Sequence, residues 1–256
     1  MKIRLLGLVA VLGVAAGWIA ACETEQPPGG CPVSHLSNFA ILDPKPGQEG
    51  LACADLTGEL ISFSKYNTPG TTTNTLGLAV ESVVGDFFDD PRRDADDVLS
   101  ATGSFDFTPT DGFCVAADLS SITVNVPAAA PDPAANLSYK FTNLRMAALP
   151  NVPGTQWTAD LAYTADGCTA QYDVVGVSPR VPCAEGLPDG GATPPDDSRC
   201  NATTLPGGRT VPACNEDGEC IHPDLAMICD PKIRDCDGEP CRVCRPNGAV
   251  PSVRSN

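Results

Sequence analysis

The 256-residue sequence is poor in basic residues, histidines and aromatic residues. It contains 16 Lys and Arg against 32 Asp and Glu, a formal net charge of −16 at pH 7, and aromatic residues make up only 5%. This negative charge repels nucleic acid and anionic lipid, so the sequence predicts no nucleic-acid partner. Only two histidines occur, His35 and His222. A histidine-dependent catalytic triad or a zinc site with several histidines is therefore not indicated, and no metal or cofactor is predicted.

Long apolar runs are missing after the first 21 residues, and 24 glycines and 25 prolines interrupt the chain often enough to exclude long helices. The one apolar run, residues 5–21, follows the basic residues Lys2 and Arg4. A membrane-spanning helix needs about 20 apolar residues and usually a charged stop. A basic start, a short apolar stretch and small residues at its end instead predict a secretory signal peptide over residues 1–21.

The residues at the end of this run, Ile19-Ala20-Ala21-Cys22, resemble a bacterial lipobox. The resemblance implies diacylglycerol on the Cys22 thiol, cleavage before Cys22 and acylation of the new amino terminus. Cysteine parity agrees, because 13 cysteines occur and setting aside one leaves an even number. The alternative, in which Cys22 follows an ordinary signal peptide and joins a disulfide, leaves one cysteine over. Glu23, the residue after the cysteine, resembles the sorting signal of lipoproteins that go to the outer membrane.

The other twelve cysteines are predicted to form disulfides, because the periplasm and the cell surface are oxidising. They are Cys31, Cys53, Cys114, Cys168, Cys183, Cys200, Cys214, Cys220, Cys229, Cys236, Cys241 and Cys244. Five precede residues 184–199 and seven follow, so at least one bridge must join the two parts. Cys114–Cys168 and Cys183–Cys200 are attractive pairs, but sequence alone does not determine connectivity.

The predicted fold class is mainly β, a β-sandwich or small antiparallel barrel, followed by a small disulfide-rich module with little regular structure. The evidence is period-two alternation of apolar residues along short segments. The alternating sets are Leu76, Leu78 and Val80, then Ile122, Val124 and Val126, then Trp157, Ala159, Leu161 and Tyr163. Two shorter pairs, Phe105 with Phe107 and Tyr172 with Val174, alternate as well. Asp-Gly pairs at 111–112 and 166–167 predict hairpin turns.

The predicted organisation has four parts after the signal peptide. They are a lipidated tether over 22–36, a β-sandwich-like domain over 37–183, a Gly/Pro/Asp linker over 184–199 and a cysteine-rich module and tail over 200–256. The last part has almost no large apolar side chains, so its stability is expected to come from disulfides rather than from a hydrophobic core.

Three motifs could carry a chemical function, but each has a plainer structural interpretation. The pair Cys241 and Cys244 forms a CxxC, but without a βαβ context a structural disulfide is favoured over a redox dithiol. The acidic stretch from Asp86 to Asp97 does not fit an EF-hand loop, and a solvated, self-paired surface is favoured over calcium binding. Trp157 and Tyr163 are expected in the core rather than on a carbohydrate-stacking platform. A pair of carboxylates at the separation that a glycosidase needs remains an open alternative, because the sequence gives no distances between side chains.

Two segments resemble cysteine-rich outer-membrane lipoproteins of myxobacteria. The first is Cys214-Asn215-Glu216-Asp217-Gly218-Glu219-Cys220 with the following Ile221-His222-Pro223-Asp224-Leu225-Ala226-Met227-Ile228-Cys229, and the second is Thr169-Ala170-Gln171-Tyr172-Asp173-Val174-Val175. The resemblance implies localisation and architecture but no activity. The sequence therefore predicts a non-enzymatic lipoprotein of the cell envelope, held in the outer membrane by its lipid and serving either recognition of a protein or glycan or envelope organisation. An exported carboxylate-dependent hydrolase acting on glycans and a calcium-stabilised adhesion module are the alternatives.

Overall fold

A computed structural model describes residues 30–34, 36–67, 70, 73–130, 133–184, 193–206, 210–236 and 239–253. Cys22, His35 and the signal peptide lie outside this part of the chain. The described part is mainly β, as predicted, and residues 31–256 form one compact unit. No helix within it has the length and apolar character needed to cross a membrane.

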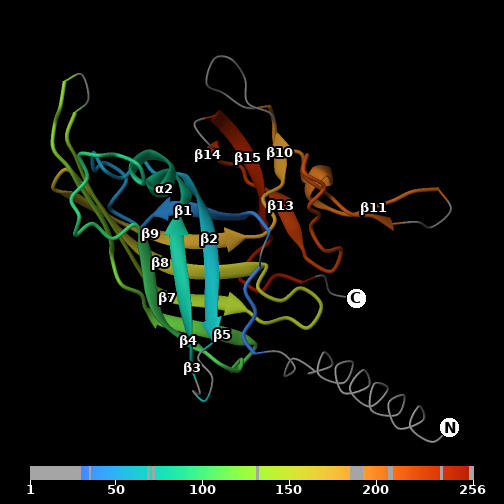
Figure 1. Cartoon of the computed structure of the whole chain (residues 1–256). Coiled ribbons are helices and arrows are strands. Elements are labelled where there is room, and N and C mark those ends of the chain that lie inside the picture. The colour runs from blue at the N-terminus through green and yellow to red at the C-terminus, as the bar shows by residue number, and fades with distance from the viewer. Residues whose placement is uncertain are drawn as a thin grey trace, which may run out of the picture. The chain divides into compact units, whose positions relative to one another are not determined.

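The main element is a nine-stranded antiparallel sheet (Figure 1). Its strand order is β4-β3-β2-β1-β9-β8-β7-β5, and β6 pairs with the other half of β7. The strands are β1 (Asn38–Pro44), β2 (Gly58–Asn67), β3 (Thr73–Val80), β4 (Ser100–Asp106), β5 (Phe113–Asp118), β6 (Ile122–Val126), β7 (Ala135–Ala147), β8 (Gln156–Ala165) and β9 (Cys168–Val177). A short helix, α2 (Glu81–Phe87), follows β3. Strands that follow one another in sequence are mostly neighbours in the sheet, and pairing of β9 with β1 brings the two ends of the meander together.

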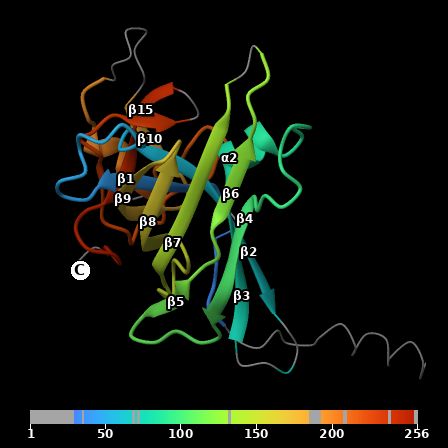
Figure 2. The same cartoon turned by 90° about the vertical axis from the view of Figure 1, so that its left-hand side faces the viewer.

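The sheet curls until β4 meets the β5–β6 segment, so it is nearly closed like a small barrel (Figures 1 and 2). The Ser120 amide donates a hydrogen bond of 2.8 Å to the Thr102 carbonyl, and Val98 and Thr123 form an antiparallel bridge. Gly103 permits this approach, because a Cβ there would lie 2.5 Å from the Asp118 carbonyl oxygen. The predicted mainly β fold is confirmed, and the structure favours its barrel form over two separate sheets.

The alternating residues identified in the sequence form the interior of this sheet. Every member of the three longer sets is buried, and so are Phe105, Tyr172 and Val174, whereas Phe107 lies just beyond the end of β4 and is 39% exposed. Trp157 is fully buried and meets the Phe63 ring edge-on at 5.2 Å between ring centroids. Tyr163 is 7% exposed and its ring lies 4.8 Å from that of Tyr139. The core interpretation of Trp157 and Tyr163 is therefore confirmed, and they form no exposed stacking platform. Both Asp-Gly pairs have the positive φ angles of a two-residue hairpin turn.

The two ends of the sheet differ, and we name them by what they carry. At the tether end, the chain enters at Cys31, and the connections 68–72, 107–112 and 148–155 join the strands. At the opposite pocket end lie the loop 45–57, α2 with the segment after it, and the connections 127–134 and 166–167. Cys31 is fully buried and Val33 is 8% exposed. The segment that the sequence assigned to the tether thus already packs into the body from Cys31 onward.

The cysteine-rich region forms smaller sheets against the outer face of β1 and β9. Its elements are β10 (Pro182–Ala184), the 3₁₀ helix η1 (Asp197–Cys200), β11 (Thr203–Thr204), β12 (Thr210–Val211), β13 (Met227–Cys229), β14 (Arg234–Cys236) and β15 (Glu239–Pro246). β15 pairs with β10, β13 and β14. Phe39 and Ile41 of β1 are fully buried in a second apolar cluster with Leu225, Met227 and Val243. The expectation that this region lacks a hydrophobic core is wrong, because its apolar side chains pack against one face of β1.

Five disulfides are described, and they correct both pairs that the sequence suggested. The bridges are Cys31–Cys114, Cys53–Cys168, Cys183–Cys229, Cys200–Cys244 and Cys214–Cys220. Cys241 is also disulfide-bonded, and the side chain of Cys236 lies outside the described part. Cys114 and Cys168 do not pair, because the start of β5 lies beside Cys31 and the start of β9 lies beside Cys53. Cys183 reaches past the linker to β13, so one bridge does join the two parts.

Candidate binding pocket

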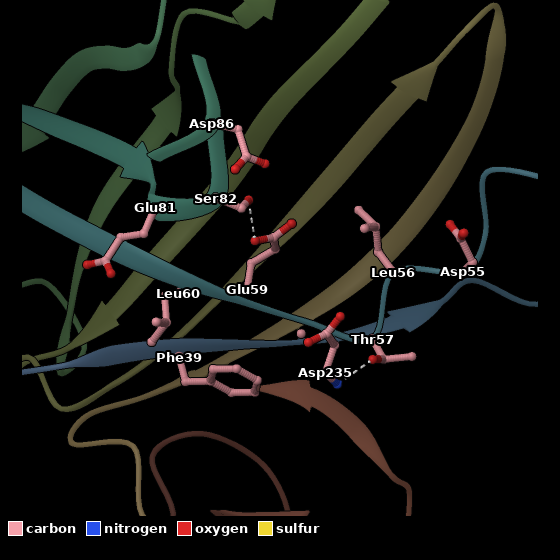
Figure 3. A pocket seen from close by; sticks show the side chains of 11 residues that line it. Phe39, Asp55, Leu56, Thr57, Glu59, Leu60, Glu81, Ser82, Asp86 and Asp235 are labelled. Atoms are coloured by element: carbon pink, nitrogen blue, oxygen red, sulfur yellow. Dashed lines mark hydrogen bonds between the residues drawn. The ribbon is translucent and has the colours of Figure 1, made fainter. Parts of the chain in front are cut away.

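A pocket of about 650 Å³ opens at the pocket end of the sheet (Figure 3). Five acidic side chains line it. Asp55 comes from the loop before β2, Glu59 from β2, Glu81 and Asp86 from α2, and Asp235 from β14. The remaining lining residues are Phe39, Leu56, Thr57, Gly58, Leu60 and Ser82, so none of the eleven described lining residues is basic. The pocket therefore combines negative charge with a small apolar floor.

Local packing brings these segments together around the start of β2. A Cβ at Gly58 would lie 2.2 Å from the Phe39 ring and 3.0 Å from the Asp235 carbonyl oxygen. Only glycine allows β1 and β14 to approach β2 this closely. The loop before β2 is held by the Cys53–Cys168 bridge and by the Tyr172 hydroxyl, which donates 2.8 Å to the Cys53 carbonyl. The pocket wall is thus built from rigid segments.

Glu59 is the most enclosed acid of the pocket, with 9% of its surface exposed. Its carboxylate accepts hydrogen bonds from the Ser82 hydroxyl at 2.8 Å and from the Tyr139 hydroxyl at 3.1 Å. Burial raises the pKa of Glu59, the neighbouring carboxylates of Asp235 and Asp86 raise it further, and the two hydrogen bonds offset part of this increase. Glu59 therefore holds a proton more readily than an exposed glutamate.

Beside the pocket, Arg234 connects the cysteine-rich region to β1. Its side chain is 1% exposed and donates to the fully buried Asp230 carboxylate through Nε at 3.0 Å and Nη2 at 2.8 Å. Nη1 donates 2.9 Å to the Leu42 carbonyl, and Nη2 lies 3.1 Å from Asp43. Burial opposes ionisation of Asp43, but the hydrogen bond from Lys232 and the Arg234 charge prevail and lower its pKa. This network fixes β14, and with it Asp235, against the pocket.

The acidic stretch from Asp86 to Asp97 pairs largely with itself and with β6. Asp90 binds Arg92 through both carboxylate oxygens, at 3.0 Å to Nε and 2.7 Å to Nη2. Asp97 accepts from the backbone and side-chain nitrogens of Asn125. Of the stretch, only Asp86 lines the pocket. These contacts agree with a self-paired surface, and calcium binding stays a prediction.

Cysteine chemistry is confined to bridges in the part of the chain that the structure describes. Cys244 pairs with Cys200 rather than with Cys241, so the CxxC is not a dithiol pair. The one cluster of three close metal-ligand side chains among the described residues is Cys183, Cys200 and Cys244, whose sulfurs lie within 4.8 Å of one another. All three sulfurs already belong to disulfides. His222 is exposed and lies 3.7 Å from Asp224, apart from this cluster.

The sequence interpretation did not identify the pocket. Asp55, Glu59, Glu81 and Asp235 carry no motif and lie up to 180 residues apart. One signal was present, since Glu59 interrupts an otherwise apolar inward row that continues with Ile61 and Phe63. An acid on the buried face of a strand indicates a special environment, because an isolated buried carboxylate is costly.

Comparison with known proteins identifies relatives of this chain. A family model described as MlpA matches residues 35–179. A Myxococcus xanthus protein named "Putative lipoprotein MlpA" is 30% identical over 263 residues, which cover 99% of this chain and 100% of the relative. No solved structure matches the chain. The matched segment spans the whole nine-stranded sheet but ends before the cysteine-rich region.

Proposed function

The chain belongs to the MlpA family, and on that premise we propose that it is an outer-membrane lipoprotein whose folded body works by binding rather than by catalysis. The lipobox around Cys22 carries the proposed anchor. The pocket of five acidic side chains carries the proposed binding role. The suggested ligand is a protein or glycan that presents positively charged groups.

The anchor follows from the sequence up to Glu23. Acyl chains stabilise membrane attachment by about 0.8 kcal/mol per buried methylene, and two or more chains hold a protein stably. Intact and peptide-mapped mass spectrometry of protein extracted from outer-membrane fractions tests this directly. We expect a mature chain that begins at acylated Cys22. An unmodified amino terminus, or recovery in the inner membrane alone, contradicts the corresponding part of the proposal.

The binding role follows from the composition of the pocket. A concave, mostly preformed site with a few convergent polar groups is the usual form of a ligand pocket. Carboxylates that have no basic neighbour in the lining attract cationic groups, and the rigid wall lowers the entropy lost on binding. The ligand class is thus set by charge, and the apolar floor of Phe39 and Leu60 suits an aliphatic stem beside the cation.

A charge-matched comparison tests the binding role. We would titrate the lipoprotein in mild detergent with a lysine-rich peptide and with chitosan oligomers, using calorimetry. The variant D55N/D86N removes two charges from the pocket, whereas D96N/D217N removes two exposed charges elsewhere. We expect weaker binding only in the pocket variant. Equal weakening in both variants would show nonspecific attraction to the net negative charge and would refute the pocket assignment.

The hydrolase is a second candidate, favoured by the raised pKa of Glu59 beside ionisable carboxylates. Carboxyl groups whose environments separate their pKa values are suited to general acid and base roles. The test is release of reducing sugar from envelope glycans by the wild-type protein and by Glu59→Gln. Activity that is present in the wild type and lost in the variant would replace the binding assignment with catalysis.

A further inference from the structure

The two ends of the sheet differ sharply in charge. The three connections at the tether end contain a single charged residue, Asp111, and two acids of the cysteine-rich region, Glu219 and Asp224, contact this end through Ser37 and Asn151. The connections at the pocket end, residues 45–57, 81–99, 127–134 and 166–167, contain eleven acidic residues against Lys45 and two arginines. Anionic lipid repels a negatively charged surface within about a Debye length, roughly 8 Å at physiological salt. The tether end is therefore the end that tolerates contact with a membrane.

The chain enters the body at this end and is fastened there by four contacts. Cys31 is bridged to Cys114 at the start of β5. Its amide donates 3.0 Å to the Phe107 carbonyl, and its own carbonyl accepts 2.8 Å from the Lys65 ammonium group. Behind it, the Ser34 and Ser178 hydroxyls form a buried hydrogen bond of 2.6 Å. The entry point is thus fixed on the body.

The distance from the lipid to this entry point is short. Nine peptide steps separate Cys22 from Cys31, and a fully extended chain spans at most about 3.6 Å per residue, so the reach is about 30 Å. β2 runs from Glu59 in the pocket to Tyr66 near the tether end, which at about 3.3 Å per residue is roughly 23 Å. The reach exceeds the length of the sheet, so the tether alone does not fix the orientation, but it keeps the entry point at the tether end within about 30 Å of the lipid.

The tether end also carries exposed apolar side chains. Tyr66 is 60% exposed, Leu36 is 41% exposed and Phe107 is 39% exposed. Tyrosine and other aromatic residues favour the membrane–water interface, where an apolar ring and a polar group both find suitable surroundings. The pocket end exposes three as well, Phe88 at 64% and Leu51 and Val98 at 41% each, so exposure alone does not distinguish the ends. Phe88, however, lies among the acidic residues that follow α2, where contact with lipid is disfavoured.

We propose that the body rests on the outer membrane through its tether end, with Leu36, Tyr66 and Phe107 at the lipid surface and the acidic pocket facing away. This orientation rests on the proposed lipid anchor at Cys22. It gives the pocket a role in engaging partners distant from the membrane, and it explains how a strongly acidic protein stays beside anionic lipid. The charged surface lies at the end of the sheet opposite the entry point of the tether.

Depth-dependent fluorescence quenching tests the orientation. The native lipidated chain would be placed in phosphatidylethanolamine and phosphatidylglycerol vesicles, with or without lipids brominated near the head group. Tyr66→Trp and Phe107→Trp report on the tether end, and Phe88→Trp is the matched control at the pocket end. The mature chain has one native tryptophan, Trp157, which is buried, so wild-type protein supplies the background. Thermal unfolding verifies that each variant is folded.

We expect brominated lipid to remove a large fraction of the added emission in Tyr66→Trp and Phe107→Trp and to leave Phe88→Trp unchanged. Quenching of Phe88→Trp equal to or greater than that of the other two overturns the orientation, as does absence of quenching in all three. Intact mass and vesicle flotation are measured on the same samples. A chain without lipid that fails to float contradicts the proposed anchor, whereas a lipidated, floating chain without end-dependent quenching contradicts the orientation alone.

Discussion

Removal of the Cys31–Cys114 bridge should destabilise this protein far more than removal of the Cys214–Cys220 bridge. Both changes eliminate one disulfide, but the first closes a loop with a sequence separation of 83 residues and the second a loop of 6. A disulfide stabilises mainly by restricting the unfolded chain, and this effect grows with the logarithm of loop length. The two double variants, C31A/C114A and C214A/C220A, therefore form a matched pair.

The expected magnitudes follow from these loop lengths. The chain-entropy relation gives about 4.5 kcal/mol for the long loop and about 2 kcal/mol for the short one at 25 °C. In a protein of this size, 1 kcal/mol shifts Tm by about 2–4 °C. The long-loop variant should thus lose about 9–18 °C and the short-loop variant about 4–8 °C. Cys31 and Cys114 are both fully buried, so lost packing adds to the first figure.

Calorimetry of the lipoprotein in mild detergent, without reductant, measures both shifts. Mass spectrometry must show that the remaining cysteines pair as in the wild type. Equal losses of Tm in the two variants, or a greater loss in the short-loop variant, would refute the unfolded-chain reasoning. The long-loop variant should also expose residues 31–36 to proteases, because the bridge fastens this segment to β5.

Three further predictions concern single residues. Gly176→Ala places a Cβ 1.7 Å from the indole ring of the β8 tryptophan and should lower the free energy of unfolding by about 1–3 kcal/mol. Gly85→Ala, in open space on α2, should instead raise it by up to about 1 kcal/mol. Urea unfolding measures both changes. Because the folded-state pKa of Glu59 is raised above 4.5, wild-type stability should fall as pH rises through the interval between the two values. The Tm advantage of Glu59→Gln should therefore grow across that interval, and a constant difference would contradict the buried-acid assignment. Arg234→Met leaves the buried Asp230 without its main partner and should cost about 3–5 kcal/mol by thermal unfolding; no loss would exclude the network as a structural link.

The β fold could be predicted because its signal is local. Trp157, Ala159, Leu161 and Tyr163 alternate along one strand, and alternation by itself places them on one face. The hairpin at Asp166-Gly167 is equally local, since positive φ is inexpensive for glycine. The presence of disulfides followed from export and from the even number of cysteines that remains after Cys22. None of these inferences needs knowledge of what lies across the sheet.

Disulfide connectivity and the pocket could not be predicted, because both depend on which distant segments meet. Cys114 and Cys168 both follow Asp-Gly turns, yet the closed sheet places the first beside Cys31 and the second beside Cys53. The cysteine-rich region looked coreless because its apolar partners, Phe39 and Ile41, lie in β1.

The amino-acid sequence by itself predicted the export signal and the lipid-attachment residue Cys22 and determined the β periodicity and the net charge, since each is a property of neighbouring residues or of composition. Tertiary structure alone decided where that charge gathers. Closure of the sheet brings β2, α2 and β14 to one end, and Gly58 lets them approach closely enough to form the acidic pocket. The same closure places Cys31 and the connections with few charges at the other end, because successive antiparallel strands return alternately to the two ends of the sheet.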